Sequence, residues 1–384
     1  MLLLGAVPTG LGPAAPPAVD VPAGLLVTVG EVTADAARLW LRVETADAVR
    51  VSYGPAAGGE TVRTVRVRPA PAADFTARVA LEPLAPGTRY AYEVTTATER
   101  VQGTFATAPP PTAETPAHLL WSGDLGGAGN CRDVEDGYRI FRAMTRRAAD
   151  LFLFVGDTIY ADQTCGTAPH VAGADYVAGS LADFHGKHRY NRADPAVQEF
   201  LRTTPVFAIW DDHEVRNNFA GPVETLMPAG RRAFLDYFPV AGAPDEPERL
   251  YRAFRWGRHV EVFILDTRQY RSANVAADGP GKTMLGEAQR RWLLAGLAAS
   301  EATWKLVVST VPLGMFTGGP FSDSWSAANL LGAPRPGGAG FVHERTLILD
   351  ALRRQGVRNV VFLSGDVHHA ELIRHEPSPG FVVH

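Results

Sequence analysis

The sequence predicts a small antiparallel β-sandwich over residues 21–108, followed by a layered α/β domain over residues 118–384. Three observations predict this fold class. Short runs in the first part alternate between apolar and polar residues, which is typical of half-buried strands. In the second part, nearly unbroken apolar runs alternate with longer amphipathic segments, as expected for strands covered on both faces. Residues 109–117 are rich in proline and are expected to form a stiff linker.

Strands of the sandwich are expected wherever turn residues separate two alternating runs. The runs lie at residues 24–29, 37–43, 49–53, 61–67, 75–81, 89–94 and 101–105. Nothing in this part indicates catalysis, because its hydrophilic residues are scattered arginine, glutamate and threonine. Residues 1–20 are expected to be an apolar leader, either the remnant of a secretory signal or a misassigned start, since they lack the usual preceding basic residues.

Strands and helices of the α/β domain are expected to alternate. The apolar strand runs lie at residues 118–122, 151–155, 206–210, 260–265, 304–309 and 357–363. Amphipathic helices are expected at residues 135–147, 285–299 and 344–354. Gly356 stands at a natural C-cap position for the last of these helices.

Composition indicates an ordinary globular protein. The chain has 384 residues, of which 46% are hydrophobic and 20% charged, and a formal net charge of -4. These values argue against intrinsic disorder and against a general polyanion-binding surface. No apolar stretch is long enough to cross a bilayer, so no transmembrane span is expected. Two cysteines, Cys131 and Cys165, rule out a disulfide scaffold or a thiolate zinc knuckle.

Aspartates follow most of the apolar strands of the second part. They are Asp124, Asp157, the pair Asp211 and Asp212, Asp266 and Asp366. A single aspartate after a strand often only caps a helix or forms a turn. However, strand ends in an open α/β sheet share one edge, so these carboxylates should converge in one crevice. Because uncompensated buried carboxylates are costly, a cation is expected among them.

Histidines beside two of these carboxylates indicate the chemistry. His213 follows Asp212 directly, and His368 and His369 follow Asp366 closely. Carboxylate and imidazole together suit Mn, Fe, Zn or Ca. Two such ions can clamp an in-line phosphoryl displacement, while a histidine that is not a ligand protonates the leaving oxygen.

Several blocks together resemble the PhoD-type alkaline phosphatases, a branch of the calcineurin-like metallophosphoesterases. The blocks lie at residues 29–40, 156–162, 210–218, 265–271, 323–325 and 365–368. The resemblance implies a four-layered α/β/β/α metallophosphoesterase domain. Residues 84–94 also resemble the closing strands of a fibronectin type III-like domain, which agrees with the predicted sandwich.

The resemblance also implies roles for individual residues, with Fe³⁺ and Ca²⁺ as the expected ions. His213 would be the catalytic histidine, and Arg268 would either clamp a substrate phosphate or form a structural ion pair. Cys131 would either reach the iron or pair with Cys165. The expected metal ligands are Asp124, Cys131, the bridging Asp157, the phenolate of Tyr160, Asp212, Asp366 and His368.

The expected function is hydrolysis of phosphate monoesters or diesters by a metal-activated hydroxide. Two alternatives remain: a Ca²⁺-dependent surface- or carbohydrate-binding protein without turnover, and a phosphonate- or sulfate-ester hydrolase on the same scaffold. No base-reading motif indicates a specific nucleic-acid partner. A monomer outside the cytoplasm is expected from the resemblance, as is a further strand and tail beyond residue 384.

Overall fold

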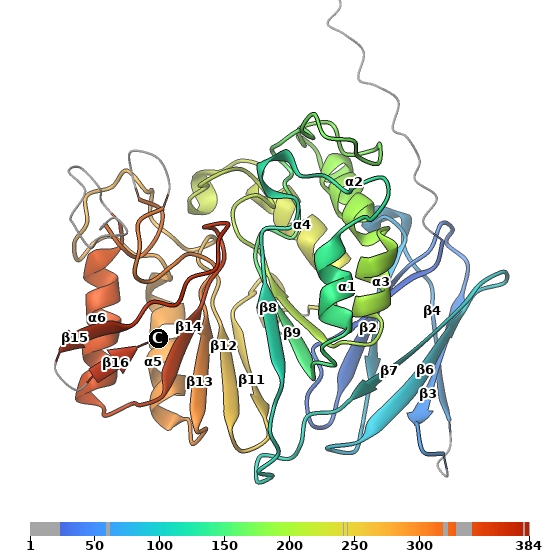
Figure 1. Cartoon of the computed structure of the whole chain (residues 1–384), viewed down its shortest axis with the longest axis horizontal. Coiled ribbons are helices and arrows are strands. Elements are labelled where there is room, and N and C mark those ends of the chain that lie inside the picture. Colours follow the sequence, from blue (N-terminus) through green and yellow to red (C-terminus); the bar gives the residue numbers. More distant parts are fainter. Residues whose placement is uncertain are drawn as a thin grey trace, which may run out of the picture.

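The computed structural model describes residues 24–58, 62–240, 242–243, 245–317, 322–327, 340–378 and 381–383 (Figure 1). The expected leader at residues 1–20 lies outside this range. The described residues form α-helices, 3-10 turns and strands in several sheets. Two of these sheets lie at the centre of the α/β part.

The first central sheet has six strands in the order β5-β2-β1-β10-β9-β8. Strands β8, β9 and β10 run parallel to one another, as expected for strands joined by helical crossovers. All residues of β9 and β10 are buried, which explains their unbroken apolar sequences. The strands are β1 (Leu26–Gly30), β2 (Ala37–Arg42), β5 (Thr76–Leu81), β8 (Leu119–Ser122), β9 (Leu151–Val155) and β10 (Val206–Ile209).

The N-terminal part contributes to two sheets. Its antiparallel sheet has the order β4-β3-β6-β7, with β3 (Val49–Pro55), β4 (Arg63–Val67), β6 (Arg89–Thr95) and β7 (Arg100–Ala106). Strands β1, β2 and β5 instead extend the first central sheet, because β1 pairs in parallel with β10 at Gly30 and Val206. The predicted sandwich and the predicted α/β domain therefore share one continuous sheet, although residues 109–117 between them form neither helix nor strand.

The second central sheet has the order β11-β12-β13-β14, and a hairpin of β15 and β16 follows it. Its outer face is covered by α5 and α6, whose residues share an apolar cluster with β12, β13 and β14. The elements are β11 (Arg252–Trp256), β12 (Val260–Ile264), β13 (Trp304–Val308), β14 (Val360–Leu363), β15 (His375–Ser378), β16 (Phe381–Val383), α5 (Gly286–Ala299) and α6 (Val342–Arg354). Gly356 follows α6 with a φ of 66°, as a C-cap glycine does.

Two more contacts establish the layering. Helices α1 and α3 cover the first sheet, where Phe141 and Phe200 pack edge-on against Phe152 of β9. The two sheets face each other through the stacked rings of Phe207 and Phe254. The order of layers is α/β/β/α, which confirms the predicted fold class (Figure 1). The helices on this side are α1 (Arg139–Thr145), α2 (Leu181–Arg192), α3 (Pro195–Leu201) and α4 (Met227–Tyr237).

Within the described part of the chain, no helix is both long and apolar enough to span a membrane.

Candidate metal centre

The strand ends bring the predicted carboxylates together, except for Asp266, which belongs to none of the groups and accepts hydrogen bonds from Trp210 and from the backbone of its own turn. Asp124 follows β8, Asp157 follows β9, Asp212 follows β10 and Asp366 follows β14. Three groups of side chains each place their potential ligand atoms within 4.8 Å of one another. The groups are Asp124 with Asp157 and His368, Asp157 with Asp212 and His213, and Asp211 with Asp212 and Asp366. Four segments far apart in sequence thus meet at one edge of the two sheets.

The backbone is unusual at these positions. Asp124, Asp157, Asp366 and His368 have φ values of 60°, 49°, 71° and 56°. Residues other than glycine rarely adopt this left-handed region, and such strain concentrates at functional sites. These left-handed residues come shortly after β8, β9 and β14, so they set the direction in which the chain and its side chains leave the strand ends.

Asp157 belongs to two of the three groups and is buried. Its Oδ1 accepts a hydrogen bond from the backbone N–H of His213 at 3.2 Å, and its Oδ2 accepts one from Tyr160 Oη at 3.2 Å. Burial and the neighbouring charges of Asp212 and Asp211 raise the pKa of Asp157 well above its usual value. A cation beside this carboxylate would relieve both effects.

Tyr160 and His368 also lie beside Asp157. Tyr160 Oη and His368 Nε2 share a hydrogen bond of 2.7 Å. His368 Nε2 also lies 3.5 Å from Asp124 Oδ1. Burial and the charges of Asp157 and Asp124 raise the pKa of the Tyr160 phenol. The phenol would therefore give up its proton only when a strongly attracting cation binds beside it. A ligand of ferric iron, which is the role expected for Tyr160, has to give up its proton in this way.

Two carboxylate oxygens in these groups lack partners. Asp212 Oδ1 and Asp366 Oδ2 are buried and accept no hydrogen bond from any described residue, as is also true of Asp266 Oδ2 outside the groups. Burial and the charges of Asp323 and Asp211 raise the pKa of Asp366 well above its usual value. Buried acceptors are nearly always satisfied in folded proteins. The donor set, oxygen with some imidazole, fits the hard or borderline cations expected from the sequence.

Arg268 does not contact the open side of this centre, which corrects its predicted role as a phosphate clamp. The side chain is fully buried. Its Nε and Nη2 donate to the two oxygens of Asp211 at 2.6 and 3.0 Å, and its Nη1 donates to Asp323 Oδ2 at 2.9 Å. The guanidinium is therefore used by carboxylates of the chain itself, in the structural ion pair that was the alternative.

His213 stacks on Tyr160 with 4.2 Å between the ring centroids. Its Nδ1 lies 2.7 Å from Asp162 Oδ1, and Asp162 Oδ2 accepts a hydrogen bond from Asn217 N at 2.7 Å. Burial opposes the charged imidazole, but Asp162 and Asp212 outweigh it and raise the pKa of His213. Asp162 was not among the predicted site residues, although it ends the quoted block at residues 156–162.

Glu214 was also missed. Its buried carboxylate accepts hydrogen bonds from the N–H and hydroxyl of Thr158, both at 2.7 Å, and from the N–H of Asp211 at 2.9 Å. Burial raises the pKa of Glu214 to about 7. It ties the turn after β9 to the turn after β10, so it fixes Asp157 relative to Asp212. The only signal for Glu214 in the sequence is its place in the run of three acids and a histidine at residues 211–214.

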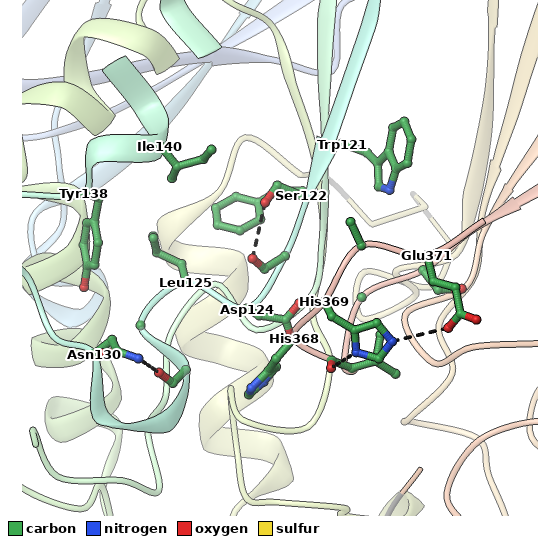
Figure 2. Close-up of a pocket in the computed structure, with 18 of the residues that line it drawn as sticks. Trp121, Ser122, Asp124, Leu125, Asn130, Tyr138, Ile140, His368, His369 and Glu371 are labelled. Atoms are coloured by element: carbon green, nitrogen blue, oxygen red, sulfur yellow. Dashed lines mark hydrogen bonds and ion pairs between the residues drawn. The ribbon is translucent and has the colours of Figure 1, made fainter. Parts of the chain in front are cut away.

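A cavity of about 1080 Å³ borders this centre on the side of Asp124 and His368 (Figure 2). Its other walls are mainly apolar and include Trp121 from β8, Ile140 from α1 and Phe362 from β14. Asp157 and Asp212 do not belong to the lining that the structure describes. The cavity therefore reaches the centre on the side of Asp124 and His368.

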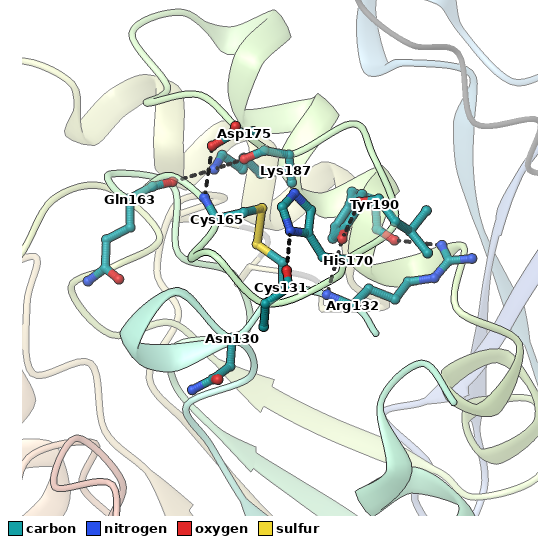
Figure 3. The surroundings of a disulfide bond; sticks show 12 residues. Asn130, Cys131, Arg132, Gln163, Cys165, His170, Asp175, Lys187 and Tyr190 are labelled. Carbon is teal, nitrogen blue, oxygen red and sulfur yellow. Dashed lines mark hydrogen bonds between the residues drawn. A yellow bond between two sulfur atoms is a disulfide. The ribbon is translucent and has the colours of Figure 1, made fainter. Parts of the chain in front are cut away.

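Cys131 forms a disulfide with Cys165, across a Cα–Cα distance of 5.5 Å (Figure 3). A disulfide sulfur has no thiolate to offer a metal ion. The predicted ligand role of Cys131 is therefore wrong, and the alternative pairing with Cys165 is correct. The predicted ligands that do come together are Asp124, Asp157, Tyr160, Asp212, Asp366 and His368.

Comparison with known proteins agrees with this geometry. The family model of the PhoD-like phosphatases matches residues 127–381. Alkaline phosphatase D of Bacillus subtilis (strain 168) is 27% identical over 276 residues, which cover 62% of this chain and 45% of that protein. The chain thus spans less than half the length of this curated relative.

A solved structure of PhoD superposes with a TM-score of 0.74 at 24% sequence identity. The match covers 89% of this chain and 71% of the other, and it extends the likeness in fold to nearly the whole chain. Because the family model covers most of the α/β part, including every strand end that carries the centre except that of β8, the chain belongs to the PhoD-like phosphatase family.

Proposed function

We propose that the protein is a metal-dependent phosphohydrolase that cleaves phosphate esters at this centre. The observation that carries the proposal is the pair of candidate metal groups that share Asp157, together with the unpartnered oxygens of Asp212 and Asp366. A bridging carboxylate between two such groups is the arrangement required for two ions acting on one phosphoryl group. Membership in the family supports the reaction class.

Two positions would hold the ions. Asp124, Asp157, Tyr160 and His368 would form one, which we call the tyrosine position. Asp157, Asp212 and Asp366 would form the other, which we call the carboxylate position. Ferric iron is the proposed occupant of the first and Ca²⁺ of the second, since phenolate suits the former and oxygen donors the latter. Ions bound there would supply Lewis-acid activation of water and of the phosphoryl oxygens.

His213 is the proposed proton donor to the leaving oxygen. Its Nδ1 is held by Asp162, so its Nε2 is the atom that can hand over a proton. Because Asp162 and Asp212 raise the pKa of His213, the imidazole keeps its proton to a higher pH than an isolated histidine. That property suits an enzyme that works at neutral to alkaline pH.

Monoesters, diesters or both are the proposed substrates, and the cavity beside Asp124 leaves room for an ester group larger than phosphate. The protein would act outside the cytoplasm, where a disulfide such as Cys131–Cys165 persists.

Hydrolysis of p-nitrophenyl phosphate and bis-p-nitrophenyl phosphate, with and without a chelator, tests the proposal. We expect turnover that the chelator abolishes, and a fall of about 10²- to 10⁴-fold in His213→Ala with metal content unchanged. The matched control is His259→Ala, because His259 lies between β11 and β12 and its imidazole contacts Thr303 rather than a residue of the centre. Tight metal binding with no turnover of either ester would instead favour the binding-protein alternative.

A further inference from the structure

The disulfide joins the two loops that carry the tyrosine position. Cys131 lies in the loop that leaves β8 through Asp124, and Cys165 lies in the loop that leaves β9 through Asp157 and Tyr160. Cys165 is five residues from Tyr160 in the sequence, and Cys131 and Tyr160 line the same small pocket. Neither cysteine is fully buried.

Backbone hydrogen bonds also join these loops. Near the strand ends, Asp124 N donates to Gly156 O at 3.3 Å and Leu125 N donates to Asp157 O at 2.8 Å. Near the disulfide, Gly166 N donates to Gly129 O and Val171 N donates to Arg132 O, both at 2.8 Å. Such bonds contribute only about 1 kcal/mol each. The disulfide is the covalent restraint between the two loops.

The tied loop also touches the ligands themselves. A methyl group at Gly127 would lie 2.8 Å from Tyr160 Oη and 2.9 Å from His368 Cε1. The backbone between Asp124 and Cys131 therefore packs directly against the phenol and the imidazole. Any outward movement of this loop would release the two side chains that meet beneath it.

The carboxylate position takes only the shared Asp157 from the two loops joined by the disulfide. Its other side chains are held from elsewhere: Arg268 lies 3.7 Å from Asp212 Oδ2 and 4.0 Å from Asp366 Oδ1, and it is anchored on Asp211 and Asp323. Glu214 fixes the turn that carries Asp212. All of these side chains except that of Asp366 are buried.

We propose that the Cys131–Cys165 disulfide is a positioning clamp for the tyrosine position, so that opening it weakens metal binding there and leaves the carboxylate position intact. This inference rests on the proposed function. A phosphine reductant opens the bond: phosphorus gives two electrons and takes an oxygen atom from water, and each sulfur takes one proton. The same chain would then be a competent phosphatase only after oxidation.

The test is titration of the metal-free full-length protein with Zn²⁺ alone in three forms: oxidised, phosphine-reduced with the reagent removed, and Cys131→Ser/Cys165→Ser. Calorimetry follows both positions, and the near-ultraviolet difference signal of tyrosinate follows Tyr160. The double variant removes the complication that free thiols bind Zn²⁺, and the reduced form covers the case in which the variant folds poorly.

We expect two bound ions in the oxidised protein. In the double variant, affinity should fall about tenfold or more at the position that gives the tyrosinate signal, as for other losses of supporting contacts, and stay unchanged at the other. Tyr160→Phe identifies the signal. Val94→Ala, buried in β6 of the N-terminal antiparallel sheet, controls for general destabilisation: it should lower the melting temperature without changing either affinity.

Equal weakening of both positions, or no weakening at either, would overturn the clamp while leaving the phosphohydrolase proposal standing. An oxidised protein that binds none of Zn²⁺, Fe³⁺ and Ca²⁺ would overturn both. A melting temperature that falls with both affinities intact would show that the disulfide serves stability alone.

Discussion

Two charged clusters in this molecule have opposite balances. At the junction between the N-terminal strands and helices α2 and α4, the single carboxylate of Asp74 receives Arg42 at 3.3 Å, Arg189 at 2.8 Å and the hydroxyl of Tyr237. At the metal centre, one guanidinium, Arg268, faces four carboxylates. The Asp74 cluster has more positively charged and hydrogen-bond-donating groups than its one carboxylate requires. The metal centre has too few positive charges for its four carboxylates.

This difference distinguishes a structural ion-pair cluster, at Asp74, from a candidate metal site. Burial alone would raise the pKa of Asp74, but Tyr237, Arg42 and Arg189 lower it below its usual value. At the centre, burial and like charges raise the pKa of Asp157 and of Asp366. The charges at the Asp74 junction therefore balance one another without a bound ion. The centre remains short of positive charge, which is the physical argument for bound cations.

Removing Arg268 should have the largest effect, because it deepens the shortage at the centre. In Arg268→Ala we expect the free energy of unfolding to fall by about 3–5 kcal/mol, since Asp211 and Asp323 would be buried without the positive charge that pairs with them. Urea denaturation of the metal-free protein measures it. Arg268→Lys, which keeps the positive charge but not the forked guanidinium, should lower the free energy of unfolding by less. An unchanged midpoint in the alanine variant would contradict the charge argument.

Asp162→Asn should lower turnover by about 10- to 100-fold, a range typical of lost supporting contacts to a functional group. The raised pKa of His213 depends on Asp162, so the variant should lower that pKa. A general acid must carry its proton, and activity on the alkaline side should therefore decline at a lower pH than in the parent. A rate–pH profile with an unmoved alkaline limb would exclude this role.

Gly127→Ala should weaken metal binding about tenfold by pushing on Tyr160 and His368, again the range expected for a disturbed supporting contact. The matched control is Gly179→Ala, where an added methyl group meets no atom within 4 Å. Zn²⁺ titration of both variants gives the comparison. Equal affinities would show that the loop yields at little cost.

Asp74→Asn should have the smallest effect, about 1 kcal/mol, because the junction is partly exposed and screened. A lowered folded-state pKa contributes stability that is present above the unfolded pKa of about 3.9 and is lost as pH falls through the folded value. The difference between parent and variant should therefore exist at neutral pH and vanish under strongly acidic conditions. Urea denaturation across this range measures it, with the exposed Asp47→Asn as control.

The sequence was sufficient to predict six strands of the α/β domain and the meeting of Asp157, Asp212 and Asp366, but it did not single out β11, β15 or β16. Unbroken apolar runs identify buried strands, and the common edge of parallel strands brings their terminal aspartates together. Helices α2, α3 and α4 were not singled out either. Helix α2 buries His185, Lys187 and Arg192, so its sequence lacks the apolar periodicity that predicts a helix.

Partner choice was beyond sequence reasoning. Arg268 is paired with Asp323, 55 residues later, and nothing local distinguishes that ion pair from a contact with substrate. Likewise, the spacing of Cys131 and Cys165 is compatible with either a metal ligand or a disulfide. The union of the N-terminal strands with β10 depends on a pairing between residues 30 and 206, which alternation within each strand cannot reveal.

That union ties the evolution of the two parts together. Gly30 lies against the backbone of Val206 so closely that an added methyl group would overlap it. Asp212 and His213 lie three and four residues beyond the end of β10, so a disturbed pairing at the first residue of β10 would reach the candidate metal centre. A chimera that exchanges the N-terminal strands with those of a relative must therefore keep a compatible pairing between β1 and β10, or lose the candidate metal centre along with its fold.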